Sequence, residues 1–265
     1  DDLECPKDAY DSHYGKRKKE RGYTQHIENL RLVAAAEDGY FPKPSEIYNA
    51  LIMPAYNEGL DVIEPALKSV VKTKYDKKHL IVVFAYEERG GKEMQKTAEI
   101  LKKRYGKEFH SFHLVKHPKD MPNEVIGKGG NITYAGRWLK GYLEKEQILF
   151  SDVIVTTMDC DNQPHKEYFN YLTYEYITRE DRKHLAYQPV CIFTNNIWDV
   201  PAPMRVLATG NSFWNIISTM RPHVLRNFAS HAQPMDALVE MDFWSVRTIV
   251  EDGHQYWRSY FYFGG

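Results

Sequence analysis

Two aspartates near the middle of the chain are the residues whose types and spacing best fit metal chemistry. Asp159 and Asp161 are separated by one residue and follow residues 153–158, a run rich in β-branched residues that we expect to form a strand. Both carboxylates can approach one hard divalent cation, Mg²⁺ or Mn²⁺, and the diphosphate oxygens that it binds. Asp-x-Asp is also a frequent turn sequence, and Asn162 and Pro164 would reinforce a turn, so the motif alone leaves both interpretations open.

A second acidic pair, Glu251 and Asp252, follows residues 248–250, which read Thr-Ile-Val. A carboxylate at the end of a strand or loop can serve as general base toward an attacking hydroxyl, and Asp252 is the candidate. Two residues later His254 could ligate a metal, and Arg258 could pair with phosphate through its planar guanidinium. The alternative is that Glu-Asp only caps the start of a helix.

A glycine-rich segment is the third candidate site. Residues 127–131 read Gly-Lys-Gly-Gly-Asn and lead into an expected helix. Glycines let the backbone come close to a ligand, and a helix N-terminus favours anionic groups. The P-loop pattern is absent, and a plain glycine turn capped by Asn131 explains the segment as well.

A fourth candidate, residues 54–58, follows the first expected strand and reads Pro-Ala-Tyr-Asn-Glu. Tyr56 offers a flat face on which a base could stack, and Glu58 offers an acceptor for base or ribose donors. A turn that ends the strand explains these residues equally well.

Short apolar runs that alternate with helical patterns from Tyr48 onward would position these side chains. This alternation is typical of βαβ units in an α/β fold with a mostly parallel sheet. Polar residues just after strands are then the first candidates for chemistry, because ligands bind outside the carboxyl ends of parallel strands. We expect strands at 50–53 (ended by Pro54), 80–86, 112–115 and 153–158, helices at 60–72, 93–104, 131–143, 166–178 and 204–220, and an apolar stretch at 185–193.

The chain divides into an extension and one larger unit. Residues 1–46 are an N-terminal extension, with a short helix at 28–37 and a basic run at 16–21 that we interpret as solvated. Residues 47–265 form the predicted catalytic domain, with a nucleotide-binding half at 48–160 and an acceptor half at 161–265. Of the tryptophans, Trp198, Trp214 and Trp244 are expected in the core.

Composition excludes several classes of protein. The 35 Lys and Arg balance 36 Asp and Glu, so a net charge of −1 argues against nucleic acid as a partner. With 43% hydrophobic residues the chain can build a core. The longest hydrophobic run has seven residues, whereas a membrane-spanning helix needs about 20. We expect a piece of a membrane-associated protein that lies at the cytoplasmic face of a membrane and is attached through segments outside this chain.

Together and in this order, the four segments resemble the family 2 glycosyltransferases, which adopt the GT-A fold, a Rossmann-like sheet flanked by helices. The resemblance covers roughly residues 48–258. The family's P-x-Y/F-N-E segment is matched by Pro54, Tyr56, Asn57 and Glu58, its glycine-lysine loop by 127–131, its D-x-D by Asp159 and Asp161, and its E-D pair by Glu251 and Asp252.

The resemblance implies metal-dependent transfer of a sugar from a nucleoside diphosphate sugar to a hydroxyl of a glycan or lipid acceptor, usually with inversion. Asp159 and Asp161, with His254, would hold Mg²⁺ or Mn²⁺, and Asp252, beside Glu251, would be the base. The nucleotide sugar would be bound by Pro54, Tyr56, Glu58, Lys128, Asp159, Arg258 and Glu87, the last standing where the family commonly has Asp. Two alternatives remain open, a nucleotidyltransferase acting on a sugar phosphate and a degenerate nucleotide-sugar-binding module.

Overall fold

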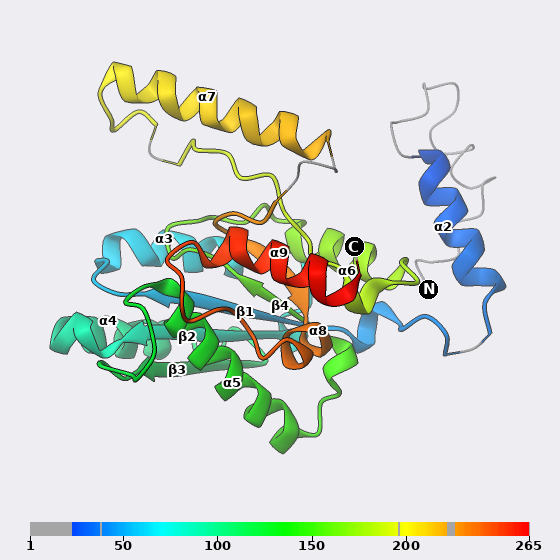
Figure 1. The fold of residues 1–265 in the computed structure, drawn as a ribbon, viewed down its shortest axis with the longest axis horizontal. Helices are drawn as coiled ribbons and strands as arrows, with labels where there is room; N and C mark the ends of the chain where they lie inside the picture. Colours follow the sequence, from blue (N-terminus) through cyan, green and yellow to red (C-terminus); the bar gives the residue numbers. More distant parts are fainter. Residues whose placement is uncertain (1–22, 38, 196, 222–225, 265) are drawn as a thin grey trace.

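The computed structural model describes residues 23–37, 39–195, 197–221 and 226–264. The basic run at 16–21 lies outside these residues. A five-stranded sheet in the order β3-β2-β1-β4-β5 forms the centre of the molecule (Figure 1). Its first four strands are parallel and β5 runs antiparallel to β4, which confirms the predicted α/β fold with a mostly parallel sheet. The strands are β1 (Tyr48–Ala55), β2 (Leu80–Glu87), β3 (Ser111–His117), β4 (Val153–Thr157) and β5 (His231–Pro234).

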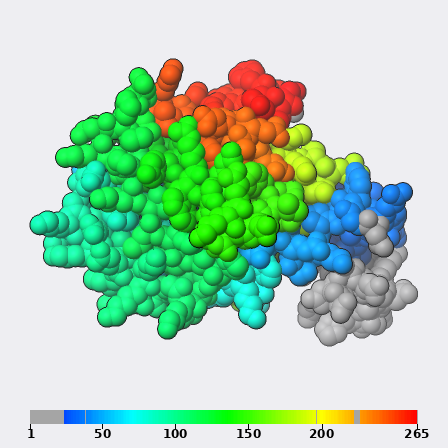
Figure 2. Space-filling view, turned by 90° about the horizontal axis from the view of Figure 1, so that it is seen from below, coloured from blue at the N-terminus to red at the C-terminus, as the bar shows by residue number. Residues whose placement is uncertain are grey.

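Helices cover both faces of the sheet, so the central strands are apolar on both sides. On one face α3 (Leu60–Val71), α4 (Gly91–Tyr105) and α6 (Tyr168–Ile177) pack on alternate strand residues such as Leu51 and Met53. On the other, α5 (Lys128–Glu146) and α8 (Met235–Glu240) pack on Ala50 and Ile52. Figure 2 shows this second face from outside, with the green segment that contains α5 beside the orange segment around α8.

Three helices lie outside these two hydrophobic layers. Helix α2 (Tyr23–Ala35) contacts α6, where Asn29 Nδ2 donates to Tyr174 Oη at 3.1 Å. Helix α7 (Ala202–Thr219) stands apart from the sheet and its covering helices (Figure 1). Helix α9 (Glu251–Phe263) carries the second acidic pair in its first turn. In the described part of the chain, none of the helices combines the length and the apolar character that crossing a membrane requires.

Strand β1 passes through Pro54, where the sequence predicted its end. Proline has no N–H to donate, so it fits a central strand only where one side has no ladder. The pairing of β1 with β4 stops at Ile52, opposite Thr157, while pairing with β2 continues to Ala55. Pro54 therefore lies beyond the last pair with β4, where its missing N–H removes no bond to that strand.

Helix α5 begins at Lys128, three residues before its predicted start at Asn131. Its glycines are needed for contacts within the protein. A Cβ at Gly129 would lie 2.6 Å from the backbone oxygen of Ser245, and one at Gly136 would lie 2.6 Å from the Phe243 ring. The glycines therefore allow α5 to approach the segment before α9, which brings Lys128 toward the acidic pair.

The second half of the chain departs most from expectation. The apolar stretch 185–193 forms no strand, and among the described residues its only pairing is a bridge between Tyr187 and Ala232. The fifth strand, β5, and the short α8 after it were not predicted. Of the three tryptophans expected in the core, Trp244 is buried, but Trp198 and Trp214 are 78% and 67% exposed, so that prediction was wrong for both.

Candidate active site

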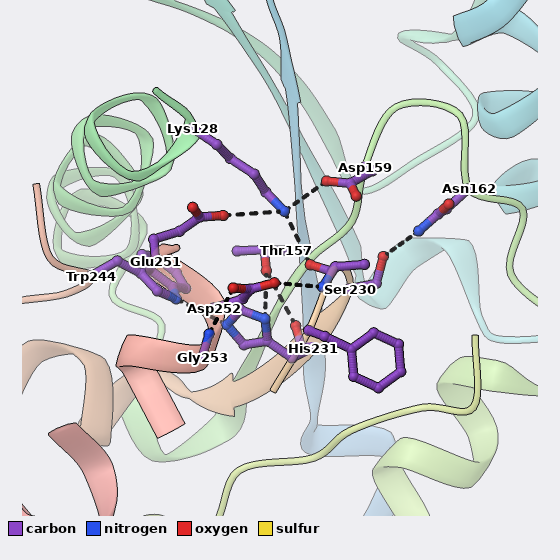
Figure 3. Close-up of polar contacts among 12 residues, drawn as sticks. Lys128, Thr157, Asp159, Asn162, Ser230, His231, Trp244, Glu251, Asp252 and Gly253 are labelled. Atoms are coloured by element: carbon purple, nitrogen blue, oxygen red, sulfur yellow. Dashed lines mark hydrogen bonds and ion pairs between the residues drawn. The ribbon is translucent and has the colours of Figure 1, made fainter. Parts of the chain in front are cut away.

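Lys128 joins the two acidic motifs that the sequence singled out (Figure 3). Its Nζ lies 2.6 Å from Asp159 Oδ1, after β4, and 3.6 Å from Glu251 Oε1, in the first turn of α9. Burial by itself lowers the pKa of this ammonium, but the carboxylates of Asp159 and Glu251 outweigh burial and the net pKa is raised. Lys128 is therefore a charged link between segments more than 90 residues apart in the chain.

The backbone of Ala229 connects this lysine to Asp252. Lys128 Nζ donates to the Ala229 oxygen at 3.0 Å, and the Ala229 N–H donates to Asp252 Oδ2 at 2.8 Å. Asp252 Oδ1 accepts a second bond, from the Gly253 N–H at 2.7 Å. One N–H donor on each oxygen fixes the orientation of the carboxylate.

The two aspartates after β4 and the nearby Glu58 form an acidic region. Partial desolvation and the neighbouring carboxylate of Asp159 raise the pKa of Asp161, and Glu58 adds to the rise. Burial and the carboxylates of Glu58, Asp161 and Asp159 also raise the pKa of the Cys160 thiol. Like charges that oppose one another's ionisation are relieved by a cation, and the Lys128 ammonium already lies on Asp159. Carboxylate oxygens are the donors that Mg²⁺ and Mn²⁺ prefer, so these residues fit such an ion.

The predicted third metal ligand does not join them. In the described residues, no group of three or more His, Cys, Asp or Glu side chains is arranged to hold a metal ion. His254 is exposed on α9. The set of Asp159, Asp161 and His254 is therefore not preassembled.

The ends of β1 and β2 meet at a second group of side chains. Arg89 forms an ion pair with the buried Glu87 and lies over the ring of Tyr56, 4.8 Å from its centroid. The Glu58 carboxylate accepts from the N–H groups of Tyr56 and Asn57, at 2.7 and 3.1 Å. Tyr56 is partly exposed. The Glu58 carboxylate closes the turn after β1. The Glu87 carboxylate neutralises Arg89, a residue that was not predicted to belong to the site.

Two predicted nucleotide-binding residues are occupied elsewhere. The Arg258 guanidinium donates to the backbone oxygens of Phe243 and Met241, both at 2.5 Å, and to Gln255 Oε1 at 3.0 Å. Burial lowers its pKa. Arg258 thus fastens α9 to the loop after α8, and Pro54 is buried inside β1. Neither contributes to the group around Lys128.

The buried His231 lies next to the site and was not predicted from the sequence. Trp244 Nε1 donates to its Nε2 at 3.0 Å, which leaves Nδ1 to carry the proton, 3.4 Å from Thr157 Oγ1. Complete burial lowers its pKa to about 3, so the imidazole is neutral. His231 lies in a strand of only four residues and belongs to no recognisable motif. The contacts of Ala229 could not be predicted either, because they are made by backbone atoms, which are the same in every residue type.

Comparison with known proteins assigns the chain to a family. The family model described as Glycosyl transferase family 2 matches residues 50–237, which is more than half of the chain. The chain belongs to this family. The match includes the first three candidate segments in chain order and confirms the resemblance seen in the sequence, with the GT-A fold that goes with it.

Solved structures similar to this family 2 domain share little sequence with it. The mannosyltransferase PcManGT from Pyrobaculum calidifontis, in complex with GDP-Man and Mn²⁺, is 16% identical with a TM-score of 0.47, over 92% of this chain and 59% of that one. TarS 1–349 from S. aureus, in complex with UDP-GlcNAc, is 17% identical with a TM-score of 0.48, over 81% and 53%. The family 2 domain thus spans a little over half the length of these structures. No curated protein matches it by sequence.

Proposed function

We propose that this family 2 domain transfers a sugar from a nucleoside diphosphate sugar to the hydroxyl of a glycan or lipid acceptor, with inversion. The observation that carries the proposal is the arrangement around Lys128. It sets the carboxylate after β4 and the carboxylates that open α9 on two sides of one ammonium group. Inverting transfer needs this division, with leaving-group stabilisation on one side and a base on the other.

The donor side is the edge formed by the ends of β1, β2 and β4. The exposed part of Tyr56, held under Arg89, offers a surface for the nucleoside base. Asp159 and Asp161 would hold Mg²⁺ or Mn²⁺, which supplies charge stabilisation to the departing diphosphate when bound. The solved PcManGT structure contains both GDP-Man and Mn²⁺, which supports this assignment by similarity of fold alone.

The acceptor side is the start of α9. Asp252 is the proposed base, because its two oxygens are oriented by N–H groups at 2.8 and 2.7 Å. An oxygen so held keeps a free lone pair for the proton of the attacking hydroxyl. Burial raises the pKa of the neighbouring Glu251, whose carboxylate faces Lys128. Glu251 is therefore a positioning residue for the lysine.

Two variants separate binding from transfer. Asp161→Ala should abolish the dependence of nucleoside diphosphate binding on Mn²⁺, because it removes a ligand of the ion. Asp252→Asn should spare binding and remove transfer, since the amide retains the shape but cannot accept the proton. Thermal shift against UDP, GDP and their sugars, with and without Mn²⁺ or Mg²⁺, identifies the donor, because a ligand of the folded state raises its melting temperature. Glu93→Ala, an exposed carboxylate on α4, is the matched control.

Each outcome bears on one part of the proposal. Equal nucleotide affinity in calorimetry with and without Mn²⁺ would remove the metal role. Transfer retained by Asp252→Asn would remove the base role. Binding without transfer in the unchanged chain would favour the degenerate binding module, while family membership already disfavours the nucleotidyltransferase. The division at residues 160 and 161, the membrane association and the cytoplasmic location stay predictions.

A further inference from the structure

Helix α7 turns polar residues toward the protein and apolar residues outward. Its buried residues are Ser212 and Asn215. Ser212 Oγ accepts from the Phe193 N–H at 2.8 Å, and Asn215 Nδ2 donates to the Cys191 oxygen at 2.9 Å. A surface helix of a water-soluble protein shows the opposite pattern. Its exposed large apolar residues are Met204, Val206, Leu207, Phe213, Trp214 and Ile216.

Helix α9 repeats this inverted pattern. All three of its buried residues are polar, namely Glu251, Gln255 and Ser259. Gln255 Nε2 donates to Gln233 Oε1 at 2.7 Å, and Gln233 Nε2 donates to Ser259 Oγ at 2.8 Å, which fastens the polar stripe to β5. Its exposed large side chains are Trp257, Tyr260, Phe261 and Tyr262.

A residue that follows α7 in the chain contacts α9. The Arg226 guanidinium lies over the Trp257 ring, 4.8 Å from its centroid. We use the term apolar surface for the exposed apolar residues of α7 and α9. Exposed apolar surface of this extent on two helices marks an interaction site.

The charge around the apolar surface indicates its partner. From residue 200 to 235 the sequence contains no Asp or Glu, and the same holds from 253 to 265, although the chain as a whole is balanced. The charged side chains of the first stretch are Arg205, Arg221 and Arg226. Two copies of one cationic surface repel each other, whereas anionic lipid headgroups attract it. Helices with Trp, Phe and Leu outward and arginines nearby are typical of binding in the plane of a bilayer interface.

We propose that α7 and α9 dock this domain on the surface of an anionic lipid bilayer. The apolar side chains enter the headgroup boundary and the arginines pair with lipid phosphates. Because α9 begins with Glu251 and Asp252, docking brings the acceptor side of the site next to the bilayer. Attachment then runs through this chain itself, in addition to any segment outside it. The proposal does not depend on transferase activity.

Vesicle binding tests the proposal with the full chain. Phe213→Ser/Trp214→Ser removes two exposed side chains, and Leu149→Ser/Ile126→Ser is the matched control, because those residues are also exposed and lie on other segments. Co-sedimentation uses phosphatidylcholine vesicles with and without about 30% phosphatidylglycerol. We expect binding to the anionic vesicles, roughly tenfold weaker for Phe213→Ser/Trp214→Ser and unchanged for the control. Arg221→Gln/Arg226→Gln should weaken binding about fivefold per arginine at low salt.

Several results would overturn the docking. These are no binding to anionic vesicles, equal binding to neutral vesicles, or equal loss in the control pair. Sedimentation equilibrium gives a further test, because a dimer that disappears in Phe213→Ser/Trp214→Ser would assign the surface to a second copy. Circular dichroism and nucleotide binding, measured on the same variants, separate these outcomes from misfolding and from failure of the proposed function.

Discussion

Replacing Lys128 with methionine removes the charge that holds the two acidic motifs together. Its Nζ lies 2.6 Å from Asp159 and 3.6 Å from Glu251, and at an effective dielectric constant of about 20 these attractions are about 6 and 5 kcal/mol before desolvation. The free-energy cost of removing the charges from water offsets most of this attraction. Glu251 is 6% exposed and behaves as a buried partner, whereas Asp159 is 37% exposed and is screened by water.

The net loss for Lys128→Met lies between the values for these two environments. Breaking a buried pair costs about 3 to 5 kcal/mol and an exposed pair less than about 1 kcal/mol. We expect about 2 kcal/mol, which for a chain of this size lowers the melting temperature by roughly 4 to 8 °C. The matched control is Lys140→Met on the same helix, whose ammonium lies 3.9 Å from Glu144 in an exposed pair. Its melting temperature should change by less than about 2 °C.

Mn²⁺ distinguishes a cation site from an ordinary ion pair. The ammonium of Lys128 competes with a metal ion for Asp159, so Lys128→Met frees that carboxylate and leaves repulsion with Glu251 unrelieved. In thermal unfolding near neutral pH without nucleotide, Mn²⁺ should raise the melting temperature of Lys128→Met more than that of the unchanged chain. The reasoning is refuted if Lys128→Met loses no more than Lys140→Met, or if Mn²⁺ shifts all three proteins equally.

Two further predictions concern pH. The folded pKa of Asp161 is raised above its unfolded value, so its ionisation opposes folding once pH exceeds both; Asp161→Asn should therefore raise the melting temperature near pH 7 and not below about pH 4. A melting temperature unchanged at both pH values would contradict this. The folded pKa of His231 is lowered to about 3, so the stability of the unchanged chain is full above about pH 6.5 and falls as the unfolded chain takes up a proton. Urea unfolding should show a loss of about 1.4 kcal/mol per pH unit from pH 6 to pH 4 that is absent from His231→Gln, and parallel curves for the two proteins would refute it.

The strands of the central sheet could be predicted because both of their faces are covered. Residues 80–86 are apolar throughout, and this pattern survives any choice of register. Strand β5 could not be predicted, because it buries His231 and Gln233, whose hydrogen-bond partners Trp244, Gln255 and Ser259 come from later segments. A polar segment is predicted to be a loop when the hydrogen-bond partners of its side chains are unknown.

The two wrong tryptophan predictions come from applying one rule. Large apolar side chains were expected inside, yet Trp198 and Trp214 lie outside, and the polar Ser212 is buried instead. Burial of apolar residues is a rule for proteins whose surroundings are water. Helix α7 buries polar side chains and exposes apolar ones, which indicates surroundings other than water alone. The composition of the whole chain does not show this pattern.

Part of the site was within reach of the sequence and part was not. Asp159, Glu251 and Lys128 belong to motifs, and the structure brings them together. Arg258 was assigned to phosphate because a guanidinium suits it, but backbone oxygens of Met241 and Phe243 suit it equally. The spacing of residues in the sequence cannot show whether a guanidinium binds a ligand or a backbone oxygen that the fold places next to it.

The backbone of Ala229 lies between Lys128 and Asp252. Its oxygen accepts from Lys128 and its N–H donates to Asp252, so the two peptide groups on either side of the Ala229 Cα each hold one charged side chain. Ala229 has a φ of 46°, a left-handed conformation that costs a residue with a Cβ about 1 kcal/mol or more. The two ion contacts of Lys128 help to offset that cost.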